Sequence, residues 1–170
     1  MDKLWAPWRA PYILKDLKKK TRGCIFCKVL KTHEKGGASQ IVETTKSSAS
    51  ILNIYPYNNG HLMVMPRRHV GDFQKLTKTE LTDLMLLLQK TQKHLQNILD
   101  PDSFNIGLNL GQEAGAGIKD HLHFHIVPRW NGDTNFMPLF SETKVLSESL
   151  ESLHSRLLDD IQKRNRRKRK

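Results

Sequence analysis

Three histidines in the stretch HLHFHIVPRW, residues 121–130, have the types and spacing that most directly indicate chemistry. His121, His123 and His125 alternate with apolar residues, and successive side chains of a strand point to opposite faces. A strand here therefore places the three imidazoles on one face and turns the apolar side chains toward the core. Pro128 predicts that regular sheet pairing stops at its position.

A row of neutral imidazoles can supply a nucleophile, a base or a metal ligand near pH 7. With a rise of about 3.3 Å per residue, the Cα atoms of His121 and His125 lie roughly 13 Å apart, whereas zinc holds each nitrogen at about 2 Å. One ion is therefore not expected to bind all three. Two neighbours sharing a hydrolytic zinc ion, and a row of neutral histidines in a polar cleft, are the alternatives. The strict alternation after a glycine-rich loop favours a functional site.

Two cysteines, Cys24 and Cys27, are the only ones in the chain, and they form a C-x-x-C motif. This spacing lets one turn present both sulfurs to a tetrahedral ion. A thioredoxin-like redox motif has the same spacing, but no βαβ pattern surrounds this one. A zinc site needs two further ligands from elsewhere in the chain.

The elements that must position these residues follow from hydrophobic periodicity. Strands are expected at 41–44, 50–56, 61–66 and 104–110, with an NNG turn at 58–60 that makes the first three an antiparallel meander. A helix is expected over 78–99, capped by Thr77 or Thr79, and a second amphipathic helix over 142–163. The core stripe of the first helix is predicted to be Leu81, Leu84, Met85, Leu88, Leu95 and Leu99.

These elements predict an α+β fold with an antiparallel sheet of about five strands, a long helix and a C-terminal helix. Residues 1–162 are expected to form a single domain, in which residues 1–35 are an N-terminal arm that carries the C-x-x-C motif. No stretch resembles a signal peptide or a membrane span, so a cytoplasmic protein is expected.

The formal net charge of +11 is concentrated at one end of the chain. Residues 163–170, KRNRRKRK, hold seven of the 28 basic residues, and the rest of the chain carries a balance of only +4. Such a run is predicted to be a disordered tail that makes at most a weak contact with RNA or another polyanion.

The histidine row and its flanks resemble the histidine-triad (HIT) nucleotide hydrolases and transferases. The resemblance extends over nearly the whole chain except the basic end, through LWAPWR, GCIFC, GHLMVMPRRH, NLGQEAGAG and VPRWNGDTNFM. Its first and last motifs are similar to the branch that contains diadenosine polyphosphate phosphorylases. The resemblance implies the same α+β fold, usually as a homodimer.

For a metal, the resemblance implies that His69 and His121 complete the ligand set of Cys24 and Cys27. A closed Cys₂His₂ set leaves no open position for water, so the zinc ion is expected to be structural. Buried thiols beside an exposed His69 are the alternative without metal.

For catalysis, the resemblance implies that His123 is the nucleophile, with its other ring nitrogen held by the carbonyl of His121. It implies that His125 stabilises charge on the phosphate oxygens, and that Asn53 binds the ribose. An Asn53 amide that is hydrogen-bonded by neighbouring backbone instead is the alternative. Backbone N–H groups of Gly115, Ala116 and Gly117, and the side chain of Asn109, are expected to contact phosphate.

The glycine-rich loop also bears on the acceptor. Hydrolase-type relatives read about A-G-Q-x-x-x-H here, whereas this chain has Ala114-Gly115 followed by Ala116-Gly117. The departure favours phosphorolysis of a dinucleoside polyphosphate such as diadenosine tetraphosphate. A HIT hydrolase acting on dinucleotides or nucleoside phosphoramidates, and an inactive RNA-binding HIT protein, are the alternatives.

Overall fold

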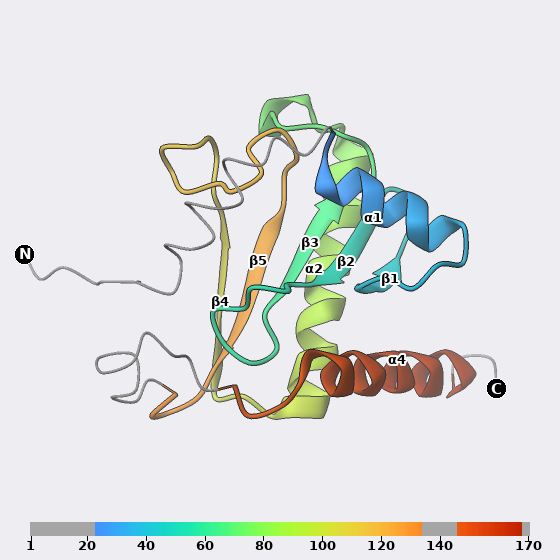
Figure 1. The fold of residues 1–170 in the computed structure, drawn as a ribbon, viewed down its shortest axis with the longest axis vertical. Helices are drawn as coiled ribbons and strands as arrows, with labels where there is room; N and C mark the ends of the chain where they lie inside the picture. Colours follow the sequence, from blue (N-terminus) through green and yellow to red (C-terminus); the bar gives the residue numbers. More distant parts are fainter. Residues whose placement is uncertain (1–22, 134–145, 168–170) are drawn as a thin grey trace, which may run out of the picture.

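The computed structural model describes residues 23–133 and 146–167. Five strands form one sheet with helices on both of its faces (Figure 1), which confirms the predicted α+β class. Most of the predicted N-terminal arm and residues 168–170 lie outside the described residues. The elements in chain order are α1 (Ile25–Glu34), β1 (Ile41–Thr44), β2 (Ser48–Leu52), β3 (Leu62–Pro66), the 3₁₀ turn η3 (Phe73–Lys75), α2 (Lys78–Leu99), β4 (Ser103–Leu108), β5 (Phe124–Arg129) and α4 (Leu150–Arg167).

The sheet has the order β1-β2-β3-β5-β4, and every neighbouring pair is antiparallel. The first three strands form the predicted meander, and β5 lies between β3 and the edge strand β4. One row of directly opposed residues crosses four strands: Ile41, Ile51, Met63 and His125. Directly opposed residues point to the same face of a sheet, so this row defines one continuous surface.

Strand β5 differs from its expected extent at both ends. It begins at Phe124, so His121 and His123 lie in the extended segment that leads into it. Pairing was predicted to stop at Pro128, but Pro128 lies opposite Phe104 and the strand continues to Arg129. The physical reason is that the paired residues of β3 and β5 end at Ile126, so Pro128 is paired on one side only, where a missing N–H is tolerated.

The start of α2 lies where the pattern predicts it, because Thr77 and Glu80 form a capping box. The hydroxyl of Thr77 accepts the Glu80 N–H at 3.2 Å, and the Glu80 carboxylate accepts the Thr77 N–H at 2.9 Å. The guanidinium of Arg68 at 2.8 Å, together with these bonds, lowers the pKa of Glu80 to about 2. The cap therefore weakens only as the pH falls toward that value.

The core face of α2 is shifted slightly from the predicted stripe. Met85 is 40% exposed, and Leu87 is buried instead at 1%. The predicted Leu84, Leu88 and Leu95 are buried in the cluster between the sheet, α2 and α4. Leu87 lies three residues after Leu84 and four before the buried Thr91, so the buried face extends to this side of the stripe and leaves Met85 at its exposed border.

A second cluster lies on the opposite face, where α1 packs against the sheet. Phe26 and Leu30 of α1 pack there with Ile51, Met63 and Met65. The strands β2 and β3 are therefore buried on both faces. Only a single turn was predicted around the cysteines, and the 10-residue helix α1 is a correction. Its signal in the sequence is the spacing of Phe26, Val29 and Leu30.

Helix α4 differs from its predicted range at both ends, because residues 146–149 are described but are not helical. The first four residues of that range, 142–145, lie outside the described residues, and α4 itself runs from Leu150 to Arg167. It buries Leu153, Leu157 and Ile161 and continues five residues into the segment that was predicted to be a disordered tail. None of the helices described is long and apolar enough to cross a membrane.

Candidate active site and metal centre

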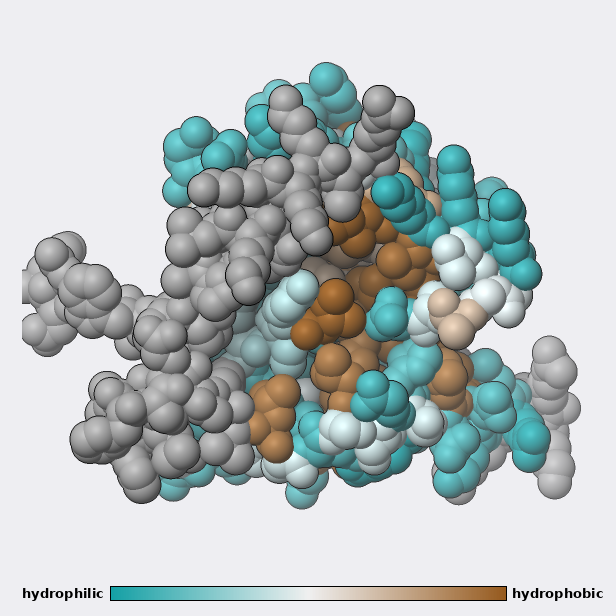
Figure 2. Space-filling model, viewed as in Figure 1, coloured by the Kyte–Doolittle hydropathy of each residue, from teal (hydrophilic) through white to brown (hydrophobic). Residues whose placement is uncertain are grey.

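A cavity of about 310 Å³ opens on the face of the sheet that carries α1. Its floor includes three members of the row of opposed residues described above, namely Ile51, Met63 and His125. Figure 2 shows hydrophobic side chains gathered in the middle of this face, beside α1 and the central strands. Three exposed large side chains, Ile25, Ile54 and Tyr55, line this one cavity, and such a grouping fits a binding surface.

His123 lies at the polar end of the cavity and is 5% exposed. Its Nδ1 lies 2.9 Å from the carbonyl oxygen of His121, as predicted. Because a carbonyl only accepts, Nδ1 carries the proton and Nε2 carries the lone pair. Burial lowers the pKa of His123, against the opposing effect of this hydrogen bond, so the ring is neutral at pH 7. The ring of Phe26, from α1, packs edge-on against the His123 imidazole, with 5.1 Å between the ring centroids, and restrains its orientation.

His125 is held by a chain of hydrogen bonds that also assigns its tautomer. The Tyr57 N–H donates to Nδ1 of His61 at 3.0 Å, so His61 carries its proton on Nε2. That Nε2 lies 2.9 Å from Nδ1 of His125, which must accept. The proton of His125 is therefore on Nε2, which makes this nitrogen a hydrogen-bond donor. The ring centroids of His123 and His125 are 5.0 Å apart, so the lone pair of His123 Nε2 and the N–H of His125 Nε2 belong to adjacent rings.

Asn53 lines the same cavity, at the end of β2. Its Oδ1 accepts the Tyr55 N–H at 2.9 Å, and its Nδ2 donates to Nδ1 of His61 at 3.3 Å. Both ends of the amide thus support the connection between β2 and β3 and the position of His61. Contact with a ribose stays a prediction for this residue.

The glycine-rich loop borders the cavity through Gly115 and Gly117, whereas Ala116 is buried at 7% exposure. The N–H groups of Gly115 and Ala116 donate to carbonyls within the loop, at 2.9 and 3.1 Å. Asn109 supports the loop through a 3.4 Å bond from Nδ2 to the Gly115 carbonyl. Of the three N–H groups expected to contact phosphate, only that of Gly117 makes no hydrogen bond to the residues described here.

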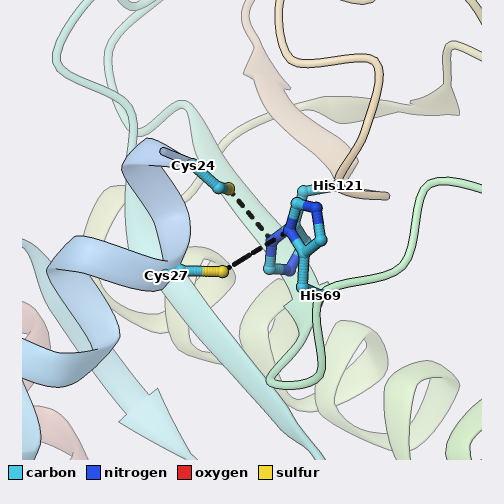
Figure 3. A group of neighbouring side chains, drawn as sticks. All are labelled: Cys24, Cys27, His69 and His121. Atoms are coloured by element: carbon cyan, nitrogen blue, oxygen red, sulfur yellow. Dashed lines mark hydrogen bonds between the residues drawn. The ribbon is translucent and has the colours of Figure 1, made fainter. Parts of the chain in front are cut away.

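The structure brings together the four predicted metal ligands, Cys24, Cys27, His69 and His121 (Figure 3). Their ligand atoms all lie within 4.8 Å of one another. Cys24 caps the N-terminus of α1 and Cys27 lies in its first turn, so one helical turn presents both sulfurs. His69 follows β3 and His121 precedes β5. The cluster therefore joins three segments that are far apart in the sequence.

The tautomer of His121 suits a metal ligand. Its Nε2 lies 2.8 Å from the carbonyl oxygen of Pro66 and must donate to it, so the Nδ1 lone pair faces the sulfurs. This Nδ1 lies 3.3 Å from the Cys24 Sγ and 3.7 Å from the Cys27 Sγ. A tetrahedral ion with Zn–S bonds of about 2.3 Å and Zn–N bonds of about 2.0 Å spaces such atoms roughly 3.3–3.8 Å apart. The donor set and its spacing fit zinc.

A metal ion bound here would have to displace the proton of the Cys27 thiol. Burial and the neighbouring Cys24 raise the pKa of the Cys27 thiol. Two thiolates this close repel each other unless a positive charge lies between them. The arrangement can therefore bind a metal ion tightly once both thiols have lost their protons.

Comparison with known proteins agrees with this geometry. A family model for the HIT domain matches residues 34–132. The chain belongs to the HIT family. This HIT chain is 36% identical over 156 residues to the AP-4-A phosphorylase of Mycobacterium tuberculosis, a match that covers 88% of the chain and 79% of that protein. It is also 36% identical over 113 residues to an asymmetrical bis(5'-nucleosyl)-tetraphosphatase of Schizosaccharomyces pombe, which covers 66% of the chain and 58% of that protein.

Solved HIT structures share the fold. A hypothetical histidine triad nucleotide-binding protein from Sulfolobus tokodaii superposes with a TM-score of 0.66 at 24% sequence identity, covering 82% of this chain and 93% of that one. A zinc-bound histidine triad protein from Mycobacterium smegmatis gives a TM-score of 0.67 at 22% identity, covering 84% and 96%. At these identities the likeness concerns the fold alone.

One residue of this HIT site was missed by sequence reasoning. His61 was read only as the start of a strand, yet it is fully buried and fixes the tautomer of His125. Its role depends on the pairing of β3 with β5, 64 residues apart, which no local pattern reveals. The available signal was a histidine directly before an apolar strand, at a position where a buried polar group needs partners.

Proposed function

We propose that this HIT protein transfers a nucleotidyl group from a dinucleoside polyphosphate, by way of a covalent nucleotidyl-histidine on His123. The single observation that carries the proposal is the bond from His123 Nδ1 to the His121 carbonyl, which leaves a neutral Nε2 lone pair in the cavity wall. The 36% identity to a phosphorylase favours inorganic phosphate as the acceptor and diadenosine tetraphosphate as the substrate.

The first chemical step forms a bond between His123 Nε2 and the α-phosphorus. The bond from that phosphorus to its bridging oxygen breaks, and ATP leaves with the electron pair. In the second step an oxygen of inorganic phosphate attacks the adenylyl group, which releases ADP and restores the imidazole. In this proposal His125 Nε2–H donates to the oxygens on which negative charge develops, and the Gly117 N–H does the same.

Zinc held by Cys24, Cys27, His69 and His121 would act structurally in this scheme, because four protein ligands leave no position for water or substrate. The bound ion would hold the segment before β5 against α1. The His121 carbonyl, which orients the nucleophile, belongs to that segment.

A homodimer, a cytoplasmic location and a weak polyanion contact through residues 163–170 complete the proposal. The dimer is supported by family resemblance. The contact is supported by the charge of the segment, of which α4 presents Lys163, Arg164 and Arg166.

Products formed from diadenosine tetraphosphate, with and without inorganic phosphate, test the choice of acceptor. We expect ADP and ATP in equal amounts only when phosphate is present, because phosphate then takes the adenylyl group. Chromatography of timed samples measures this directly. AMP and ATP in both tubes would instead establish a hydrolase, and cleavage of neither would contradict the proposed substrate.

Replacing His61 with alanine tests the positioning of His125. We expect kcat to fall roughly 10- to 100-fold, as for other residues that orient a catalytic group, while KM changes little. His61→Gln keeps a donor near His125 Nδ1 and should recover part of the rate. A purely structural role would instead lower the melting temperature without this separation of kcat from KM or rescue by glutamine.

A further inference from the structure

Gln40 lines the cavity beside β1, three strands away from β5, which carries His125. It immediately precedes β1, and its carbonyl accepts the Leu52 N–H at 3.0 Å, which anchors its backbone to β2. The opposed row leads from Ile41 through β2 and β3 to His125 on β5. With about 4.8 Å between neighbouring strands, β1 and β5 are roughly 14 Å apart. A nucleotide bound at the histidines can therefore extend along this floor toward Gln40.

The surfaces between these two ends are apolar. Ile51 and Met63 form the floor, and Val29 of α1 and Ile118 also line the cavity. Such side chains contact the faces of an aromatic base equally well whatever the base is. Discrimination between bases therefore needs a polar group at the edge of the ring.

Gln40 is the polar side chain in the right place. The polar side chains that line the cavity are Gln40, Asn53, Tyr55, Tyr57, His123 and His125. All except Gln40 come from the connection after β2 or from the segment that carries the histidines. The Gln40 side chain is exposed, and its amide makes no hydrogen bond within residues 23–133 and 146–167. It is thus available to a ligand without breaking any contact in that part of the chain.

We propose that Gln40 determines base specificity by binding the edge of an adenine that carries the 6-amino group and N7. On this edge adenine offers one donor and one acceptor, which match the oxygen and the NH₂ of an amide. Guanine offers two acceptors there, so an amide can satisfy only one. The inference rests on the proposed function, since it requires the nucleotide phosphorus at His123.

The specificity test compares diadenosine and diguanosine tetraphosphate with the full-length chain. We expect Gln40→Leu to lower kcat/KM for the adenine substrate on the order of 10-fold, through KM, and to leave the guanine substrate unchanged. Gln40→Glu keeps the acceptor but loses the donor, so it should retain part of the preference. Gln89→Leu, on the exposed side of α2, is the matched control and should behave as the unaltered protein.

Binding of the mononucleotides separates this inference from the proposed function. Calorimetry with AMP, GMP and 7-deaza-AMP needs no turnover. The unaltered protein should bind AMP more tightly than either of the others, and Gln40→Leu should remove both differences. If AMP is preferred but neither dinucleotide is cleaved, the proposed function fails and the assignment of Gln40 stands. An AMP preference that survives in Gln40→Leu, or no preference in the unaltered protein, overturns the assignment.

Discussion

Replacing His123 with alanine is expected to abolish turnover of diadenosine tetraphosphate while AMP still binds. The substitution removes the Nε2 lone pair that attacks phosphorus, and the neighbouring His125 is not expected to replace it, because its Nδ1 accepts a hydrogen bond from His61. Loss of a covalent nucleophile lowers kcat by roughly 10⁴-fold or more. The floor of Ile51 and Met63 does not depend on this imidazole, so affinity for the nucleotide should persist.

Product formation and AMP affinity are measured on the same preparations. His33→Ala is the matched control, since His33 lies at the exposed end of α1 and its side chain bonds only to Ser39 among the residues described. Brief incubation with adenine-labelled substrate should leave label on the unaltered chain and none on His123→Ala. A near-normal rate in the variant would refute the assignment of the nucleophile.

Replacing Cys24 with serine is expected to remove bound zinc and to lower the melting temperature. Serine cannot supply a thiolate at the N-terminus of α1, so the remaining three ligands hold the ion less tightly. A metal present at about 1000 times its dissociation constant contributes about 4 kcal/mol to the free energy of unfolding. A loss of this size is readily visible in thermal unfolding.

Metal content per chain, measured by atomic emission, is the direct readout for the cluster. His69→Ala should lose the metal in the same way, whereas His33→Ala should keep one ion per chain. Full retention of stoichiometric zinc by Cys24→Ser would exclude the proposed ligand set. A chelator that stops catalysis at once, without any change in unfolding, would favour the zinc-hydrolase alternative instead.

The parts of this site that were predictable from the sequence are those set by short-range spacing. The alternation predicted that His121, His123 and His125 point away from the core. It also predicted that the intervening apolar residues point into it, and Leu122 and Ile126 are buried in the core with α2. The capping box of α2 was readable in the same way. Family resemblance supplied the two histidines of the metal cluster, because nothing local links residue 69 to residue 24.

The parts that could not be predicted depend on register between distant strands. His61 and Gln40 acquire their places only when β1, β2, β3 and β5 are aligned, and a shift of one residue would turn their neighbours to the other face. Helix α1 covers the second face of β2 and β3, and its only local signal was the short spacing of Phe26, Val29 and Leu30. Packing also decided between Met85 and Leu87 on α2, a choice that helical periodicity leaves open.

His121 belongs both to the candidate metal cluster and to the proposed active site, and this has a consequence for how the protein is expected to lose activity. Its ring faces the cysteines, while its carbonyl fixes the tautomer of His123, the proposed nucleophile. A chain without metal is therefore expected to turn over more slowly, because the His121 carbonyl no longer holds His123 in the tautomer that leaves the lone pair on Nε2. In a preparation in which only some chains hold metal, the rate per milligram of protein is then expected to be proportional to the metal content.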